Sequence, residues 1–346
     1  ETGRILRSGG CAIEVEEEPV TSPGRAWASL IFGLALLVFG AKMLVEGAEA
    51  IARCYGVPEA VIGVTVVAFG TSAPELVINV IGALQGQTAL AFGNISGSNL
   101  ANFGLVLGCA AVISPIALQG KIIRRELPLL LLATAVLFTM TLDHTLRTSV
   151  AILDRSDAIV MLLLFGIFIY IMVMDFLRQQ QDPLVTTVEK MSKARHLEKR
   201  SDWILIIAGI GGLALGGQLT IDNGSDLAAS MGVPPEIVGM LVIAIGTSLP
   251  ELITSIFAAM NREADLCVGN IIGSNIFNCM FVLPISALIN PLAIPPGGSM
   301  DIFVSLVFSA ILIPIFIVGK GTMSRQIGVV FLLGYAGYMV SRIYLS

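Results

Sequence analysis

The chain has 346 residues, of which 55% are hydrophobic and 13% are charged, and its formal net charge is −5. A soluble globular domain carries about 25% charged residues, so this chain has too few polar side chains to cover a surface in water. The composition predicts a multi-spanning membrane protein in contact with the lipid bilayer. The sequence contains no basic patch, and we expect no nucleic-acid partner. The five cysteines are isolated and are interpreted as small buried side chains.

Ten apolar runs are candidates for membrane-spanning helices, each of which needs about 20 residues. In chain order they are roughly 27–50, 58–84, 88–113, 126–142, 156–177, 202–222, 234–260, 264–290, 300–318 and 325–345. Residues 1–26 include the acidic, proline-containing stretch EVEEEPVTSPGR and are expected to form a solvated tail. A polar, basic loop at 178–201 leaves five runs on each side, so 27–177 and 202–346 are the two predicted halves.

The distribution of Lys and Arg predicts how the chain is oriented, because cytoplasmic loops carry an excess of both. Placing the 178–201 loop in the cytoplasm leaves thirteen basic residues inside and six outside. Both termini then lie outside a cell membrane. Because each half has an odd number of helices, two halves related in sequence would insert upside down relative to each other.

The two halves are related in sequence at an offset of 176 residues. Residues 68–107 align with 244–283 without a gap, and 18 of the 40 positions are identical. The matches fall on Gly, Thr, Ser, Pro, Glu and Asn, whereas chance similarity between apolar helices would match Leu, Ile and Val. The alignment predicts an inverted repeat, an architecture in which transporters bind their substrates near the midplane, between the repeats.

Each copy of the repeat places a glutamate directly after a proline, in AFGTSAPELV (68–77) and AIGTSLPELI (244–253). Proline removes a helical hydrogen bond and frees the carbonyl four residues earlier, which a membrane tolerates only where the backbone lines a cavity. The polar side chains of both copies offer oxygen ligands, which favour hard cations such as Ca²⁺ or Na⁺. The predicted side-chain ligands are Glu75, Glu251, Ser72, Ser248, Ser98, Ser274, Asn102 and Asn278.

Two carboxylates in one pocket repel each other unless a cation neutralises them, and charged acids inside a bilayer are costly. One Ca²⁺ or several Na⁺ could neutralise the two carboxylates, but the two kinds of ion cannot occupy the same position at once. Competition for one set of oxygen ligands therefore predicts ion exchange. A protonated glutamate paired with nearby backbone is the simpler interpretation, and the duplication argues against it. Asn94 and Asn270 either hydrogen-bond the broken helix or touch an ion. Asn79 and Ser255 are candidates for the border of the site.

The motifs GTSAPEL (70–76) and GNISGSNLAN (93–102), with GTSLPEL (246–252) and GNIIGSNIFN (269–278), resemble the two repeats of the sodium/calcium exchanger family. The resemblance covers 27–346 and is strongest to the compact prokaryotic branch, because no large cytoplasmic domain separates the halves. It implies an all-α membrane protein with ten transmembrane helices in two inverted-topology five-helix repeats. It also implies an antiporter that exchanges Na⁺ for Ca²⁺ by alternating access, which is not an enzyme and needs no cofactor.

The resemblance implies individual roles for the site residues. Glu75 and Glu251 would bind Ca²⁺ together with the backbone carbonyls of Thr71 and Thr247. The remaining members would line flanking Na⁺ sites and complete the midplane ring: Ser72, Ser98, Ser248 and Ser274, the carbonyls of Ala68 and Ala244, and the amides of Asn102 and Asn278. Potassium-dependent relatives carry Asp at the position of Asn278, which argues against K⁺ cotransport here. The first and sixth helices would slide against the rest.

Three alternatives stay open from the sequence. The first is a Ca²⁺/H⁺ exchanger or another divalent cation exchanger, and the second is a cation channel with a ring of glutamates. The third is a membrane scaffold that transports nothing. A monomer is compatible with the sequence, which does not fix the oligomeric state, the stoichiometry or the direction of transport.

Overall fold

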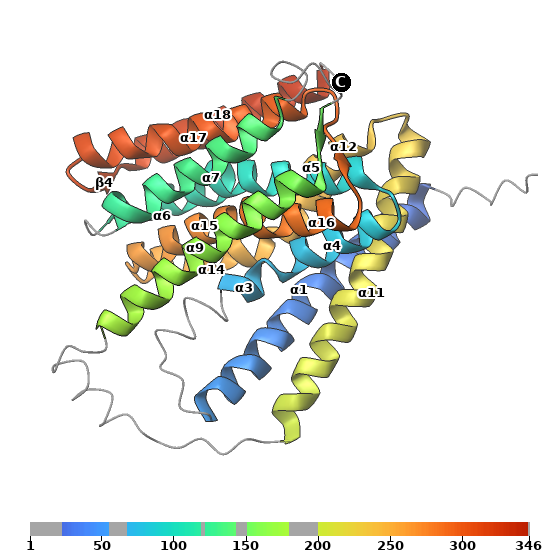
Figure 1. Ribbon diagram of the computed structural model, residues 1–346, viewed down its shortest axis with the longest axis horizontal. Coiled ribbons are helices and arrows are strands. Elements are labelled where there is room, and N and C mark those ends of the chain that lie inside the picture. Colours follow the sequence, from blue (N-terminus) through green and yellow to red (C-terminus); the bar gives the residue numbers. More distant parts are fainter. Residues whose placement is uncertain (1–22, 55–67, 119–121, 143–150, 180–199, 345–346) are drawn as a thin grey trace, which may run out of the picture.

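The computed structural model describes residues 23–54, 68–118, 122–142, 151–179 and 200–344, and within them the protein is almost entirely helical (Figure 1). Seven of the described helices are long and apolar enough to cross a membrane, or eight if one bent pair is counted as a single span. An all-α membrane protein is therefore confirmed. The predicted tail up to residue 22 and the predicted loop at 180–199 lie outside the described residues.

The helices of the first half follow the predicted spans in chain order. They are α1 (Pro23–Cys54), α3 (Ala68–Thr71), α4 (Ala73–Leu84), α5 (Thr88–Ala101), the π-helical turn η2 (Asn102–Leu107), α6 (Gly108–Ile113), the π-helical turn η3 (Ile122–Glu126), α7 (Leu127–Met140) and α9 (Arg155–Gln179). The first ten residues of the predicted second span, 58–67, lie outside the described residues.

The helices of the second half repeat this order. They are α11 (Arg200–Met231), α12 (Pro235–Val238), the π-helical turn η4 (Gly239–Ile243), α13 (Ala244–Thr247), α14 (Leu249–Met260), α15 (Ala264–Phe277), the π-helical turn η5 (Asn278–Val282), α16 (Leu283–Ile289), α17 (Gly298–Val318) and α18 (Arg325–Tyr344). Helix α11 continues nine residues beyond the predicted end at residue 222. Two observations accompany the extension: Asn223 donates to the Leu219 carbonyl within the same helix, and Gly224 packs against Ile243 of η4.

Among the described residues, four short strands form two small antiparallel sheets, and each sheet joins the two halves. Strand β1 (Ile116–Ala117) pairs with β4 (Thr322–Met323), and β2 (Ile152–Leu153) pairs with β3 (Leu292–Ala293). Strands β1 and β3 occupy the same position in the two repeats, at the offset of 176 residues. Because β3 precedes α17 and β4 follows it, the sheets lie at opposite ends of that helix. This crossed pairing is what inverted repeats produce.

The helices that carry the asparagine motifs lie at the centre of the protein. In an apolar 18-residue stretch of Thr88–Ile113, 83% of the residues are buried, and 78% are buried in such a stretch of Ala264–Ile289. The share is only 22–33% in the other five single spans that the structure describes. Glycines let α5 approach its neighbours closely, since a Cβ atom at Gly97 would lie 2.6 Å from the Met240 carbonyl. The two central helices therefore have little lipid contact, and their polar side chains face protein.

Helices α1 and α11 form a separate antiparallel pair, which Figure 1 shows side by side in blue and yellow. Glycines at seven-residue intervals bring the two backbones together: Gly33 meets Gly216, and Gly40 meets Gly209. A Cβ atom at Gly40 would lie 2.8 Å from the Leu213 nitrogen. Small residues allow such close helix packing where lipid offers no hydrophobic driving force.

Candidate ion-binding site

Each half contains a helix that breaks at a serine. Helix α3 gives way to α4 at Ser72 (φ −90°, ψ 11°), and α13 gives way to α14 at Ser248 (φ −80°, ψ 5°). Both pairs of angles lie in the sparsely populated bridge region. The proline that follows is the second residue of the new helix, where its missing N–H costs nothing. In the second half the two segments are bent by 45°, so the predicted helix break is confirmed.

The two breaks bring the two glutamates together across the halves. Glu75 and Glu251 stand in the first turns of α4 and α14, and each is 1% exposed. The Ser72 hydroxyl donates to Glu251 Oε1 at 3.0 Å, and the Ser248 hydroxyl donates to Glu75 Oε1 at 3.5 Å. The serine at each helix break therefore donates a hydrogen bond to the carboxylate of the opposite half.

The serines of the central helices lie in the same cluster. Ser274 on α15 donates to Glu251 Oε1 at 3.3 Å. Ser98 on α5 donates to the Ala244 carbonyl at 3.5 Å, and its oxygen lies 3.4 Å from the Thr247 hydroxyl. Both serines are fully buried. The carbonyl of Ala244 thus faces the cluster, and the equivalent Ala68 is the first residue of α3.

Thr71 and Thr247, each directly before a helix break and called the break threonines, form hydrogen bonds with asparagines of the central helices. Thr247 donates to Asn94 Oδ1 at 3.3 Å, and Thr71 donates to Asn270 Oδ1 at 3.5 Å. The sequence left two roles open for Asn94 and Asn270, and the geometry places both in contact with the broken helices. All four side chains are buried.

Asn102 and Asn278 begin the π-helical turns η2 and η5, and π-bulges often mark functional sites. Asn102 Nδ2 donates to Asn275 Oδ1 at 3.0 Å, and Asn278 Nδ2 donates to Asn99 Oδ1 at 3.2 Å. Sequence reasoning missed Asn99 and Asn275. The signal was present, since both copies of the repeat carry asparagine at this position.

Four buried oxygen atoms in the cluster have no hydrogen-bond partner: Glu75 Oε2, Glu251 Oε2, Asn102 Oδ1 and Asn278 Oδ1. More than nine in ten buried polar groups are normally paired. All four atoms are acceptors, and each comes with its equivalent from the other half. An acceptor without a donor, buried beside a second carboxylate, is suited to a hard cation, because Ca²⁺ takes six to eight oxygen ligands.

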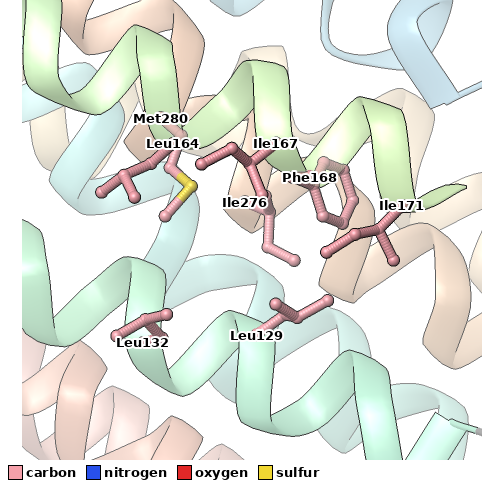
Figure 2. Close-up of a pocket in the computed structure, with 8 residues that line it drawn as sticks. All are labelled: Leu129, Leu132, Leu164, Ile167, Phe168, Ile171, Ile276 and Met280. Carbon is pink, nitrogen blue, oxygen red and sulfur yellow. The ribbon is translucent and has the colours of Figure 1, made fainter.

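An apolar hollow lies between α7, α9 and the central α15–η5 segment, as Figure 2 shows. Its lining consists of Leu129, Leu132, Leu164, Ile167, Phe168, Ile171, Ile276 and Met280. The side chains offer no oxygen ligand, so this hollow is separate from the polar cluster around Glu75 and Glu251.

Comparison with known proteins gives a consistent result over nearly the whole chain. The profile of the family described as "Sodium/calcium exchanger protein" matches residues 25–174 and 201–344. The inner membrane protein YrbG of Escherichia coli is 36% identical over 291 residues, which are 83% of this chain and 87% of YrbG. The sodium/calcium exchanger MaX1 of Methanosarcina acetivorans is 27% identical and is matched over 91% of this chain and 98% of its own.

A solved structure of the sodium-calcium exchanger NCX_Mj, soaked with Na⁺ and Ca²⁺, is similar with a TM-score of 0.62 and 28% identity. The similarity covers 92% of this chain and 98% of that one. It confirms the predicted fold of ten transmembrane helices in two inverted repeats. The family consists of transporters and not of enzymes. The chain therefore belongs to the sodium/calcium exchanger family, in the prokaryotic branch that includes YrbG and NCX_Mj.

Proposed function

We propose that this cation exchanger transports Ca²⁺ in exchange for Na⁺, using one site between its two halves. The observation that carries the proposal is the crossed pair of glutamates. Glu75 and Glu251 come from opposite halves, are buried, and each retain one carboxylate oxygen with no donor. The names of MaX1 and NCX_Mj as sodium/calcium exchangers support the same pair of ions.

Ca²⁺ is the ion that the two carboxylates fit best. One Ca²⁺ carries two positive charges and neutralises both side chains at once. In this proposal Glu75 and Glu251 bind Ca²⁺ through their unpaired oxygens, and the carbonyls of Thr71 and Thr247 complete the coordination. The hydrogen bonds from Ser72 and Ser248 hold the carboxylates in place.

Na⁺ occupies overlapping positions around the same carboxylates. The proposed Na⁺ ligands are the hydroxyls of Ser72, Ser98, Ser248 and Ser274, the carbonyls of Ala68 and Ala244, and the amide oxygens of Asn102 and Asn278. Because these positions share the two glutamates with Ca²⁺, both ion sets cannot bind together. Exchange follows if the protein reorients only when one set neutralises the site. The glycine-packed α1–α11 pair is the proposed moving element.

The proposed orientation follows the distribution of basic residues. The loop at 178–201 lies in the cytoplasm, between a first half at 27–177 and a second half at 202–346, and the tail at 1–26 and the C-terminus lie outside. The printed name of YrbG as an inner membrane protein supports a bacterial-type cell membrane.

Flux measurements in proteoliposomes test this function. Vesicles loaded with Na⁺ are diluted into Na⁺-free buffer that contains radioactive Ca²⁺, and we expect uptake that stops when the Na⁺ gradient is removed. Uptake that ignores Na⁺ and follows a pH gradient would identify a Ca²⁺/H⁺ exchanger. Uptake that needs no ion on the opposite side would identify a channel, and the absence of any cation flux would refute transport.

A further inference from the structure

Behind the ion-binding cluster, each half contains a chain of buried polar side chains that ends on the break threonine of the opposite half. In the first half, Asn79 donates to the Ala91 carbonyl at 3.2 Å and accepts from Asn94 at 2.8 Å. Asn94 in turn accepts from Thr247 at 3.3 Å. The three polar side chains are fully buried, so every hydrogen bond in this series is protected from water.

The second half contains the equivalent chain with different chemistry. Ser255 occupies the position of Asn79, and it accepts from Asn270 at 3.4 Å. Asn270 then accepts from Thr71 at 3.5 Å. Each of these bonds is longer than its counterpart. The clear difference lies behind the threonines, where the bond from Asn94 to Asn79 at 2.8 Å is within the usual range and the bond from Asn270 to Ser255 at 3.4 Å is not. The second chain therefore holds its threonine less firmly than the first.

The two halves compensate for this difference in volume. In the first half, Asn79 is larger than its equivalent, Ser255. Its neighbour Ala91 is smaller than the equivalent residue of the second half, Cys267. The Cys267 thiol contacts Ser255 by a side-chain hydrogen bond, and it fills the space that the longer asparagine takes in the first half. Both pairs are buried. The asymmetry therefore involves two buried positions in each half.

We infer that Asn79 is a positioning residue for ion binding, acting on Thr247 through Asn94, and that the two break threonines are held with unequal firmness. This inference rests on the proposed function. A primary amide can present either its oxygen or its NH₂ group, and the bond from Asn94 Nδ2 to Asn79 Oδ1 fixes which one faces Thr247. Without Asn79, the amide of Asn94 is free to turn over and present NH₂ to the threonine.

If the Asn94 amide turns over, its NH₂ group faces Thr247, and the threonine hydroxyl must accept a hydrogen bond from Asn94 instead of donating one. Thr247 is the residue whose backbone carbonyl is a proposed Ca²⁺ ligand. Leaving one buried polar group without its partner costs about 1–3 kcal/mol. At about 1.4 kcal/mol for each factor of ten, this corresponds to a loss of roughly 5-fold to 150-fold in Ca²⁺ affinity. The loss should appear in the KM for Ca²⁺, because the ligands themselves remain.

The test compares the two halves with matched substitutions in the full-length protein in proteoliposomes. Asn79→Leu keeps the branched shape of the side chain, although leucine is larger, and it removes every hydrogen bond. Ser255→Ala removes the side-chain hydrogen bonds in the second half at nearly constant volume. We expect Asn79→Leu to raise the KM for Ca²⁺ by roughly 5-fold to 150-fold at a nearly unchanged maximal rate, and Ser255→Ala to raise it by less than about 3-fold. Equal effects from the two substitutions would overturn the inference.

A transplant keeps the test informative if Asn79→Leu does not fold. The double variant Asn79→Ser with Ala91→Cys builds the second-half chemistry into the first half without a cavity. We expect it to raise the KM for Ca²⁺ by about 2-fold to 5-fold, less than the loss of all hydrogen bonds. A wild-type KM in this variant would contradict a positioning role for Asn79.

Two further readouts separate this inference from the proposed function and from a merely structural role. If wild-type protein transports Ca²⁺ and Asn79→Leu lowers only the melting temperature without Ca²⁺, the positioning role fails and the exchanger stands. If wild-type protein shows neither Na⁺-dependent uptake nor a rise in melting temperature with added Ca²⁺, both fail.

Discussion

Replacing Glu251 by glutamine removes one of the two buried charges with little change in shape. Two hydroxyls that reach this carboxylate, from Ser72 and Ser274, donate to the same oxygen, Oε1. Because both need an acceptor, the amide oxygen of the variant will take that position. The NH₂ group will then occupy the position of Oε2, the oxygen that has no partner. The substitution therefore removes a charge and a candidate ligand while it keeps two hydrogen bonds.

The expected effect on Ca²⁺ affinity is large. Removing one member of a buried, hydrogen-bonded pair of charges costs about 2–5 kcal/mol, which corresponds to a loss of about 30-fold to 4,000-fold in affinity. The ion-free protein should not be destabilised, since two unit charges about 4 Å apart repel by about 4 kcal/mol at an effective dielectric constant near 20. The variant loses that repulsion together with its affinity.

Thermal melting of purified protein with and without Ca²⁺ measures both effects. At a Ca²⁺ concentration of about 100 times Kd, binding stabilises the wild-type protein by about 2.7 kcal/mol. With an affinity lowered 30-fold, the same concentration stabilises the variant by only about 0.9 kcal/mol. We therefore expect Glu251→Gln to melt at or above the wild-type temperature without Ca²⁺, to gain little from added Ca²⁺, and to support no exchange.

Asp222→Asn is the matched control, because it makes the same chemical change at an exposed carboxylate on α11. Asp222 accepts from Gln85 and Gln218 at the surface, so its loss should leave the Ca²⁺ response and the flux unchanged. Wild-type exchange by Glu251→Gln would refute the assignment of this carboxylate to the ion site. A loss of flux with a full Ca²⁺-induced stabilisation would show that Glu251 acts in reorientation and not in binding.

Three further predictions concern the helix pair, the C-terminal ion pair and the ion requirement. Gly40→Leu should lower the melting temperature and the yield, because its side chain would meet the α11 backbone and overpacking costs about 1–3 kcal/mol. Gly211→Ala, with open space around it, is the control. Arg342→Met should lower the free energy of unfolding by about 3–5 kcal/mol, because it leaves Asp301 buried without its cation. Arg325→Gln, at the surface, is the control and should change it little. Replacing K⁺ by choline on both sides should leave Ca²⁺ uptake unchanged, since Asn278 keeps the site at two formal charges.

Much of the fold could be predicted from the sequence, because in a membrane the local pattern of apolar residues largely determines where the helices lie. An apolar run of about 20 residues must be a helix in lipid, since no water is present to satisfy its backbone. The predicted spans therefore match the described helices closely. The error at the end of α11 has a different origin. There, the apolar run stops at residue 222, and the helix continues because Gly224 packs against Ile243 of another segment.

The membership of the site was easier to predict than its contacts. The two glutamates, the serines and the asparagines were chosen because the repeat carries them twice, and the fold brings them together in one buried cluster. Ser72 and Glu75 are three residues apart, a spacing that predicts only a shared face within one helix. The actual partner of Ser72 is Glu251, on the other half. Spacing along a helix describes neighbours within that helix, and it contains no information about a second segment 179 residues away.

The crossed contacts follow from the inverted repeat itself. Two equivalent segments can meet only around the axis that relates them, and near that axis a residue of one half faces a different residue of the other half. Each such contact then occurs twice, with the roles exchanged. Ser72 with Glu251 and Ser248 with Glu75 are one such pair of contacts. The asparagines provide a second pair, since Asn102 bonds Asn275 and Asn278 bonds Asn99. Sequence alignment identifies which residues are equivalent, and only the helix breaks and close glycine packing determine which of them lie next to the axis. A cation bound there touches both halves, so any movement of one half against the other must change its coordination.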